Sequence, residues 1–349
     1  MAKISDVARQ AGVSTATVSA VVNERGTVEA GTRRRVLDAI KKLHYQPNLY
    51  ATNLARGRTR LLGLVVSDIM NPFFGEIAQA VRQEAQARGY EVSLASTQFS
   101  QTDLVSTIRR LIGMQVAGVA IMSTEMDNRV LEILRAHKMP AVFEDVGTVG
   151  ETVSNIRIDY EGGIFKAVRY LFDLGHRKIL YVRSYPDTQQ SEDAFLSICM
   201  RTQAFKKALK QFKPEGLGAD IVTCPGPGPK AGRHAIEKAL ESSNFTAVIA
   251  IADPVALGVL RGLQARGIEV PRQVSLVGFD NSYLCEYLCP SLTSVNIPRS
   301  RLGQMVVDCL VRNVESKEPG RELILETELI VRESTAPPHH GKRRRTLRH

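Results

Sequence analysis

From Leu61 onward the chain alternates short apolar runs with segments whose apolar residues recur at helical spacing. This alternation constrains the fold most strongly, because strand and helix repeats of this kind place parallel strands in one sheet with right-handed crossovers. A first set of strands is expected at 61–66, 91–95, 116–122 and 140–143, with helices at 73–89, 102–114 and 128–138. A second set is expected at 178–182, 220–224, 247–251 and 274–278, with helices at 161–175, 195–212, 230–242 and 254–266. The pattern predicts an α/β protein with two doubly wound subdomains.

The first sixty residues follow a different pattern, with two short helical stripes on either side of a tight turn. The first stripe covers 4–11, Gly12 ends it, and a second stripe begins near Val18. Ser14 is a good N-cap for the second helix, because its hydroxyl can accept a hydrogen bond from an amide of the first turn. A third helix is expected at about 32–44. The pattern predicts a three-helix unit that contains a helix-turn-helix.

In such units the second helix enters the major groove, and its exposed residues contact base edges. The candidate DNA contacts in this unit are Ser5, Ser14, Thr15, Ala16, Thr17, Ser19, Ala20 and Asn23. From the periodicity alone, a three-helix bundle with a solvated basic face remains the alternative.

The positive charge of the chain is concentrated at its two ends. The formal net charge is +10, and residues 1–60 contain eleven Lys and Arg against four acids. Residues 339–349 add five basic residues and no acid, so the 278 residues between carry a net charge of −2. Basic ends of this kind suit a polyanionic partner such as double-stranded DNA. The tail at 339–349 is too polar to pack, and we expect it to be disordered, with or without a contribution to phosphate binding.

Several other classes of protein are not favoured by the sequence. No run of about 18 apolar residues and no apolar N-terminal stretch occurs, so we expect a cytoplasmic, nucleoid-associated protein without membrane contact. The five cysteines have no paired metal spacing, and Cys285 and Cys289, four residues apart, are expected to pack rather than to bind a metal. No phosphate-binding loop, Gly-x-Ser-x-Gly or His-Glu-x-x-His motif is present, so neither catalysis nor a cofactor is expected.

Motifs in both parts of the chain together span about 335 residues. In the N-terminal unit they occupy 4–8, 12–19, 21–23 and 43–48, and in the body 71–74, 159–163, 174–179, 253–258, 274–281 and 290–295. With these runs the chain resembles the lactose/galactose repressor (LacI/GalR) family of bacterial transcription regulators. The resemblance implies a homodimer that binds operator DNA, usually as a repressor, and a body of periplasmic-binding-protein type with a small-molecule effector between its lobes.

This resemblance implies a division of the chain into four parts. A DNA-binding headpiece covers 1–46, a hinge helix and linker cover 47–60, the effector-binding and dimerisation core covers 61–338, and the basic tail covers 339–349. Within the core, the N-terminal lobe is expected at about 61–158 and 293–320. The C-terminal lobe is expected at about 161–290 and 321–338.

The resemblance also implies roles for residues that contact DNA. Thr15, Ala16 and Ala20 occupy the positions that read operator bases, although neither alanine can offer more than a contact with a thymine methyl group. Leu54 matches a leucine that the family inserts into the minor groove from a hinge helix, where an apolar wedge kinks DNA. The alternative for Leu54 is an ordinary packing residue of a linker helix. The other hinge candidates are Asn48 and Ala51.

For the effector, the resemblance places six residues at the cleft between the lobes: Asn71, Phe73, Phe74, Arg201, Asp253 and Asp280. Phe195 and Ser197, from the segment just before Arg201, are further candidates. Arg201 and Asp280 suit a polar ligand, because a guanidinium donates a rigid fork of hydrogen bonds and a carboxylate accepts them. Either aspartate could instead cap a helix, and we expect one of the two phenylalanines in the core and the other in the pocket.

The effector is expected to be a sugar or another metabolite. Stacking on a sugar is not supported, because the chain has no Trp, and Val146 and the 225–229 loop stand where relatives often place an aromatic ring. The apolar stretch before Arg201 leaves a less polar effector as an alternative. A solute-binding transport protein is a rival interpretation, which the headpiece and the missing signal peptide disfavour. The sequence leaves open whether effector releases or strengthens DNA binding.

Overall fold

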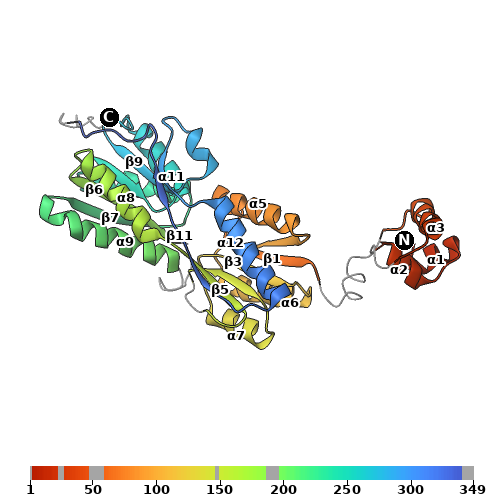
Figure 1. Ribbon diagram of the computed structural model, residues 1–349. Coiled ribbons are helices and arrows are strands. Elements are labelled where there is room, and N and C mark those ends of the chain that lie inside the picture. Colours follow the sequence, from red (N-terminus) through yellow and green to blue (C-terminus); the bar gives the residue numbers. More distant parts are fainter. Residues whose placement is uncertain (1, 23–26, 47–58, 146–148, 186–195, 340–349) are drawn as a thin grey trace. The chain divides into compact units, whose positions relative to one another are not determined.

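The computed structural model describes residues 2–22, 27–46, 59–145, 149–185 and 196–339 (Figure 1). Five predicted site residues lie outside the described residues: Asn23, Asn48, Ala51, Leu54 and Phe195. Val146, most of the hinge and the tail from residue 340 lie outside them too. The chain divides into two compact units, Met1–Arg60 and Leu61–His349, which we describe separately.

The N-terminal unit contains the helices α1 (Ile4–Ala11), α2 (Thr15–Val22) and α3 (Ala30–Lys42). Gly12 ends α1 with a φ of 64°, a left-handed conformation that a residue without a Cβ adopts readily. The Oγ of Ser14 accepts a hydrogen bond from the amide of Thr17 at 3.1 Å, which confirms the predicted cap. Val7, Val18 and Val36, one from each helix, are fully buried and form the centre of a small apolar core.

The second unit is built on two six-stranded sheets. The first has the order β11-β5-β4-β3-β1-β2, and its strands are all parallel. These strands are β1 (Leu61–Val66), β2 (Glu91–Ser96), β3 (Gly118–Met122), β4 (Ala141–Glu144), β5 (Val153–Ile158) and β11 (Glu322–Leu325). The helices of this N-terminal lobe are α5 (Pro72–Ala87), α6 (Gln101–Gly113), α7 (Asn128–Ala136) and α12 (Arg299–Val311). Figure 1 shows α12 beside α5, although the two are far apart in the sequence.

The second sheet has the order β12-β10-β9-β8-β6-β7. Its strands are β6 (Lys178–Tyr185), β7 (Gly218–Pro225), β8 (Ala247–Ala250), β9 (Ser275–Asp280), β10 (Thr293–Asn296) and β12 (Glu328–Ile330), of which β12 is antiparallel to β10. The helices of this C-terminal lobe are α8 (Tyr160–Asp173), α9 (Leu196–Phe212), α10 (Pro229–Ser242) and α11 (Asp253–Ala265), followed by the short helix η3 (Tyr283–Glu286). Apolar residues between sheet and helices are buried, as in the stacked rings of Tyr181 and Phe205.

The C-terminal part of the chain requires a correction to the predicted lobe boundaries. We expected residue 293 to begin a return to the N-terminal lobe, but β10 pairs with β9, with Thr293 opposite Val277. We expected residues from 321 in the C-terminal lobe, but β11 pairs with β5, with Leu323 opposite Ile156. Each of these two strands has only four residues, and periodicity in so short a run does not indicate which sheet it joins.

The chain therefore passes between the lobes three times, after β5, after β10 and after β11. The first and third crossings are hydrogen-bonded to each other: the amide of Asp159 donates to the carbonyl of Leu325 at 2.9 Å, and the hydroxyl of Thr327 donates to the carbonyl of Asp159 at 2.8 Å. The side chain of Asp159 also caps α8 through the amide of Gly162. These bonds tie two of the crossing segments together between the sheets.

Candidate functional site

The surface of α2 is the candidate DNA-reading surface of the headpiece. Ser5 lies on α1, and Ser14, Thr15 and Ala16 lie at the start of α2; all four are exposed. Farther along α2 the remaining described candidates are half-buried: Thr17, Ser19 and Ala20. The first turn of α2 has no acidic residue to neutralise the positive end of its dipole, a feature that favours contact with phosphate. The structure thus places the seven described DNA candidates on or directly before α1 and α2, and those exposed on α2 lie at its start.

A pocket lies between the two lobes of the core, at the carboxyl ends of β3 and β4. The lobes line it with Ser123, Thr124, Met126, Glu144, Asp145, Leu196 and Ser197. The first five residues belong to the N-terminal lobe, and Leu196 and Ser197 begin α9 of the C-terminal lobe. Its volume of about 10 Å³ is roughly that of one water molecule. In doubly wound folds the carboxyl ends of parallel strands are where ligands bind.

Arg201 lies one helical turn after Ser197 on α9 and forms a buried ion pair with Asp280 at the end of β9. The Nη2 of Arg201 is 3.1 Å from the Oδ1 of Asp280, and its Nη1 donates to the carbonyl of Ile251 at 2.8 Å. The guanidinium carbon lies 4.3 Å from the ring centroid of Phe279 and 4.8 Å from that of Tyr160. The structure brings these two predicted residues together, and the Nε of Arg201 forms no hydrogen bond within the described part of the chain.

Two acids at the end of β4 complete this buried charged cluster. The hydroxyl of Tyr160 donates to Glu144 at 3.0 Å, and the amide of Ile158 donates to the Oδ1 of Asp145 at 2.9 Å. Glu144 and Asp145 are 8% and 6% exposed, and the Oδ2 of Asp145 has no hydrogen-bond partner among the described residues. The cluster therefore holds buried polar atoms with unused bonding capacity, which is unfavourable unless a ligand or water contacts them.

Burial shifts the protonation of all three carboxylates in this cluster. It raises the pKa of Glu144 to about 8, with the nearby charge of Asp145 as the second cause. It raises the pKa of Asp145 to about 6 and that of Asp280 to about 7, although Arg201 opposes both shifts. The pKa rises because burial disfavours the ionised form of a carboxyl group. Carboxyl groups with pKa values shifted in this way are often found at functional sites.

The backbone at the ends of β4 and β9 adopts conformations that are uncommon for residues with side chains. Asp145 has a φ of 63°, Asp280 a φ of 105° and Asn281 a φ of 54°. Backbone strain of this kind costs free energy and persists where the surrounding structure holds it, which is often at ligand sites. The strain lies in the segments that carry the buried carboxylates.

The other predicted effector residues have structural contacts instead. The side chain of Asn71 accepts a hydrogen bond from the amide of Phe73 at 3.1 Å and so caps α5. Phe73 and Phe74 are 3% and 5% exposed and both belong to the apolar core. Both rings therefore pack in the core, and a contact of either ring with the effector stays a prediction.

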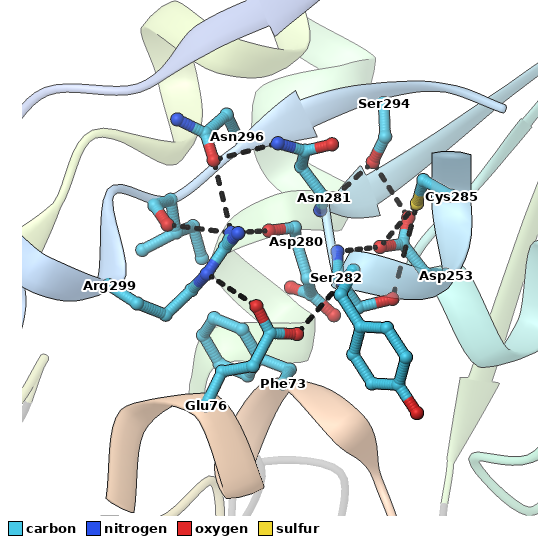
Figure 2. A network of polar contacts seen from close by, with 12 residues as sticks. Phe73, Glu76, Asp253, Asp280, Asn281, Ser282, Cys285, Ser294, Asn296 and Arg299 are labelled. Carbon is cyan, nitrogen blue, oxygen red and sulfur yellow. Dashed lines mark hydrogen bonds and ion pairs between the residues drawn. The ribbon is translucent and has the colours of Figure 1, made fainter. Parts of the chain in front are cut away.

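Asp253 is buried at the start of α11, and both of its oxygens are used within the C-terminal lobe. One oxygen accepts from the hydroxyl of Ser294 at 2.7 Å, and the other accepts from the amide of Ser282 at 2.7 Å and from the thiol of Cys285 at 3.2 Å (Figure 2). These bonds hold the segment that follows β9, which carries Asn281. Asp253 thus has a structural role at the end of β9, and its contact with the effector stays a prediction.

A second polar network joins α5 of the N-terminal lobe to the C-terminal lobe. Figure 2 shows Glu76 on α5 beside Arg299, with 3.2 Å between the carboxylate and the Nε. The other oxygen of Glu76 accepts from the amide of Tyr283 at 3.0 Å, and Arg299 donates to the carbonyl of Asp280 at 2.7 Å. Glu76 therefore contacts the C-terminal lobe near the same strand end that carries the effector candidate Asp280.

Sequence reasoning missed Glu144, Asp145 and Tyr160, which are central to the cluster, and the buried acid Glu125. Glu125 accepts hydrogen bonds from Ser67 at 2.6 Å and from Thr97, so the ends of β1, β2 and β3 meet at this carboxylate. A signal for the first two acids was present: both follow the apolar run 141–143 at the carboxyl end of an expected parallel strand.

Models of two protein families match the chain. The family described as bacterial regulatory proteins, lacI family, matches residues 3–48, and a periplasmic binding protein-like domain matches residues 168–335. The structure contains no helix among the described residues that is long and apolar enough to span a membrane.

Transcriptional regulators are similar to this chain over nearly its whole length. The HTH-type transcriptional repressor PurR of Vibrio vulnificus (strain CMCP6) is 31% identical over 336 residues, which cover 96% of this chain and 98% of that protein. The catabolite control protein A of Priestia megaterium is 32% identical over 336 residues, which cover 95% and 98%.

Among solved structures, the lac repressor dimer bound to operator and the anti-inducer ONPF matches with a TM-score of 0.81 and 26% identity, over 96% of this chain and 99% of that one. The complex of the transcriptional regulator CelR with cellobiose matches with a TM-score of 0.68 and 31% identity, over 96% and 100%.

Proposed function

The chain belongs to the lacI family of bacterial regulatory proteins, and we propose that it represses transcription by binding operator DNA through α2 and senses its effector at Arg201 and the acids around it. It is a DNA-binding transcriptional regulator with an effector-binding core and not an enzyme. The observation that carries the assignment of the effector site is the buried ion pair of Arg201 and Asp280 beside unsatisfied polar atoms between the lobes.

For DNA reading, we propose that the exposed start of α2 lies in the major groove. Ser14 and Thr15 supply hydroxyl groups there, and Ala16 supplies a methyl group that suits thymine. The exposed residues Arg34, Arg35, Lys41 and Lys42 of α3 supply charge for phosphates. Leu54, outside the described residues, is proposed as the minor-groove wedge because of the family resemblance alone.

For the effector, we propose binding between the lobes, with Ser197 of the pocket wall and Arg201 and Asp280 of the adjoining charged cluster as contacts. The lobes move apart to admit the effector, because the pocket of about 10 Å³ has room for about one water molecule. Complexes of similar regulators with cellobiose and with ONPF support a small organic molecule as the class of ligand. Effector changes the relative orientation of the lobes, and Glu76 senses that change because it binds both Arg299 and the backbone of Tyr283. The size of the coupling equals the preference of the effector for one orientation over the other.

We also propose that the core forms a homodimer through an apolar face that it exposes. Met70 is 83% exposed and Ile69 51%, and both line the same groove of about 760 Å³ as Tyr283, which is 56% exposed. The ring of Tyr287, 79% exposed, lies against that of Tyr283. Apolar exposure of this size favours coverage by a second copy. The dimer is proposed to act in the cytoplasm, at the nucleoid.

The test of this function is the selection of genomic fragments by the purified full chain at about 150 mM salt, where nonspecific binding to phosphates is weakened. We expect enrichment of a near-palindromic site of roughly 14–20 base pairs, because the two-fold symmetry of a dimer is mirrored in its operator. Fragments without any common sequence would contradict specific repression by the free protein.

A further inference from the structure

The charges in the pocket between the lobes do not balance. Arg201 uses its Nη2 on Asp280 and its Nη1 on the carbonyl of Ile251, so its charge is largely matched by one acid. Glu144 and Asp145 remain, both buried and both at the pocket wall. Within the described part of the chain neither forms an ion pair, and the nearby Arg157 is half exposed and pairs with Glu322 at 3.1 Å. Among the described residues, the buried charged cluster at the pocket therefore has two more carboxylates than it has matching cations.

We propose that the effector of this regulator is a small organic cation, a protonated amine whose ammonium group is bound by Glu144 and Asp145. This inference rests on the proposed function, because it takes the pocket between the lobes to be the effector site. The Oδ2 of Asp145 has no partner within the described residues and accepts from the ammonium, and the Nε of Arg201 donates to an oxygen on the same molecule.

Other ligand classes fit this pocket less well. A neutral sugar would leave both carboxylates buried without a counter-charge, which costs free energy unless they stay protonated. An anion would be repelled by the two acids. A metal ion needs more ligands than two, and the residues described contain no group of three or more His, Cys, Asp or Glu side chains arranged to hold one. An amine, by contrast, donates several hydrogen bonds to two adjacent carboxylates.

Protonation explains how the acids are accommodated when no cation is bound. The groups that face Glu144 are Asp145 on the same strand end, Tyr160 of α8, Arg201 of α9 and Asp280 of β9. Burial raises the pKa of Glu144 to about 8 and that of Asp145 to about 6, so near neutral pH the empty pocket holds at least one proton on these acids. Binding of an ammonium releases that proton, and the affinity for the cation rises as the pH rises from 6 to 8.

The test uses metabolites of a bacterium that carries this gene, freed of protein and separated by ion exchange into cationic, neutral and anionic fractions. Each fraction is added to the full chain bound to its selected operator, and the melting temperature and the operator affinity are measured at pH 6 and pH 8. We expect only the cationic fraction to change both quantities, with a larger effect at pH 8. A compound retained by the protein is then identified by mass spectrometry.

Substitutions test whether Glu144 and Asp145 bind the cation. Glu144→Gln combined with Asp145→Asn is expected to weaken the response to the cationic fraction at least tenfold, whereas Glu241→Gln, an exposed acid on α10, leaves the response unchanged. If the neutral or anionic fraction acts instead, the cation proposal is overturned and effector control stands. If no fraction acts, effector control itself fails, and the cation proposal falls with it. The pH dependence of the unmodified chain tests the proposal even if the double variant does not fold.

Discussion

Two sets of buried carboxylates in the core differ in how they are satisfied. Asp253, behind the end of β9, accepts three hydrogen bonds from Ser282, Cys285 and Ser294. Glu144 and Asp145, at the end of β4, have fewer donors, and one oxygen of Asp145 has none among the described residues. Burial alone therefore does not distinguish a structural carboxylate from one that awaits a ligand, but the number of donors around it does.

Removal of the Asp253 carboxylate, which has hydrogen bonds to both oxygens, is expected to lower the free energy of unfolding most. Asp253→Ala leaves the amide of Ser282, the hydroxyl of Ser294 and the thiol of Cys285 without their common acceptor. Each buried donor left without its acceptor costs about 1–3 kcal/mol, and three donors lose theirs together. Urea unfolding followed by circular dichroism measures this loss. Stability equal to that of the unmodified chain would contradict a structural role for the Asp253 carboxylate.

Removal of one serine hydroxyl near each set of carboxylates gives the next largest effect on stability. Ser294→Ala deletes a 2.7 Å hydrogen bond to the buried carboxylate of Asp253, and hydrogen bonds to charged groups contribute about 1.5–3 kcal/mol. Ser197→Ala changes a residue of the pocket wall and is expected to alter stability by about 0.5 kcal/mol or less. The two variants are matched in chemistry, so equal losses in the same urea titration would contradict the distinction.

Neutralisation of Glu144 is expected to stabilise the empty protein at alkaline pH. Burial raises the pKa of Glu144 from 4.5 to about 8, so the stability that this group contributes is present below about pH 4.5 and is lost as the pH rises through 8. Glu144→Gln carries no charge at any pH and still accepts from Tyr160. We expect a gain of about 1 kcal/mol at pH 8.5, or roughly 2–4 °C in melting temperature, and almost none at pH 5. A loss of stability at pH 8.5 would argue against an unmatched carboxylate.

A loss of stability of similar size is expected at a polar contact outside the core. Ser14→Ala removes the cap on the amide of Thr17, and losses of this kind are about 1 kcal/mol. The change is confined to the headpiece, so its unfolding transition shifts while that of the core does not. Scanning calorimetry separates the two transitions, and a shift of the core transition would show that the two units are not independent.

Much of the fold was predictable from the sequence because periodicity is strong in long elements. Each helix and strand expected in the described parts of the headpiece and core is present, with ends within three residues of the prediction. No prediction was made for β5, β10, β11, β12 or α12. Their lobes are set by pairing partners distant in the chain, such as Leu323 with Ile156, which a local pattern does not reveal.

The site was predictable only in part. The family resemblance placed Arg201 and Asp280, which the structure brings together. It also placed Phe73, Phe74 and Asp253, whose packing and hydrogen bonds within the core the sequence did not reveal. Contacts between distant parts of the chain explain the difference. The amide of Ser282, which donates to Asp253, lies nearly thirty residues later in the chain, and the sequence does not show that contact. Glu144 and Asp145 were visible as two acids after an apolar strand, but their lack of counter-charge follows only from three-dimensional neighbours.

Effector control through the pocket between the lobes is tested most directly at Arg201. Operator affinity is measured by fluorescence anisotropy for the unmodified chain and for Arg201→Ala, each with and without the metabolite fraction that acts on the unmodified chain. The account predicts that Arg201→Ala binds operator but no longer responds to the fraction, because the charged cluster has lost the arginine that pairs with Asp280. A response of Arg201→Ala equal to that of the unmodified chain would contradict the account and place the effector elsewhere.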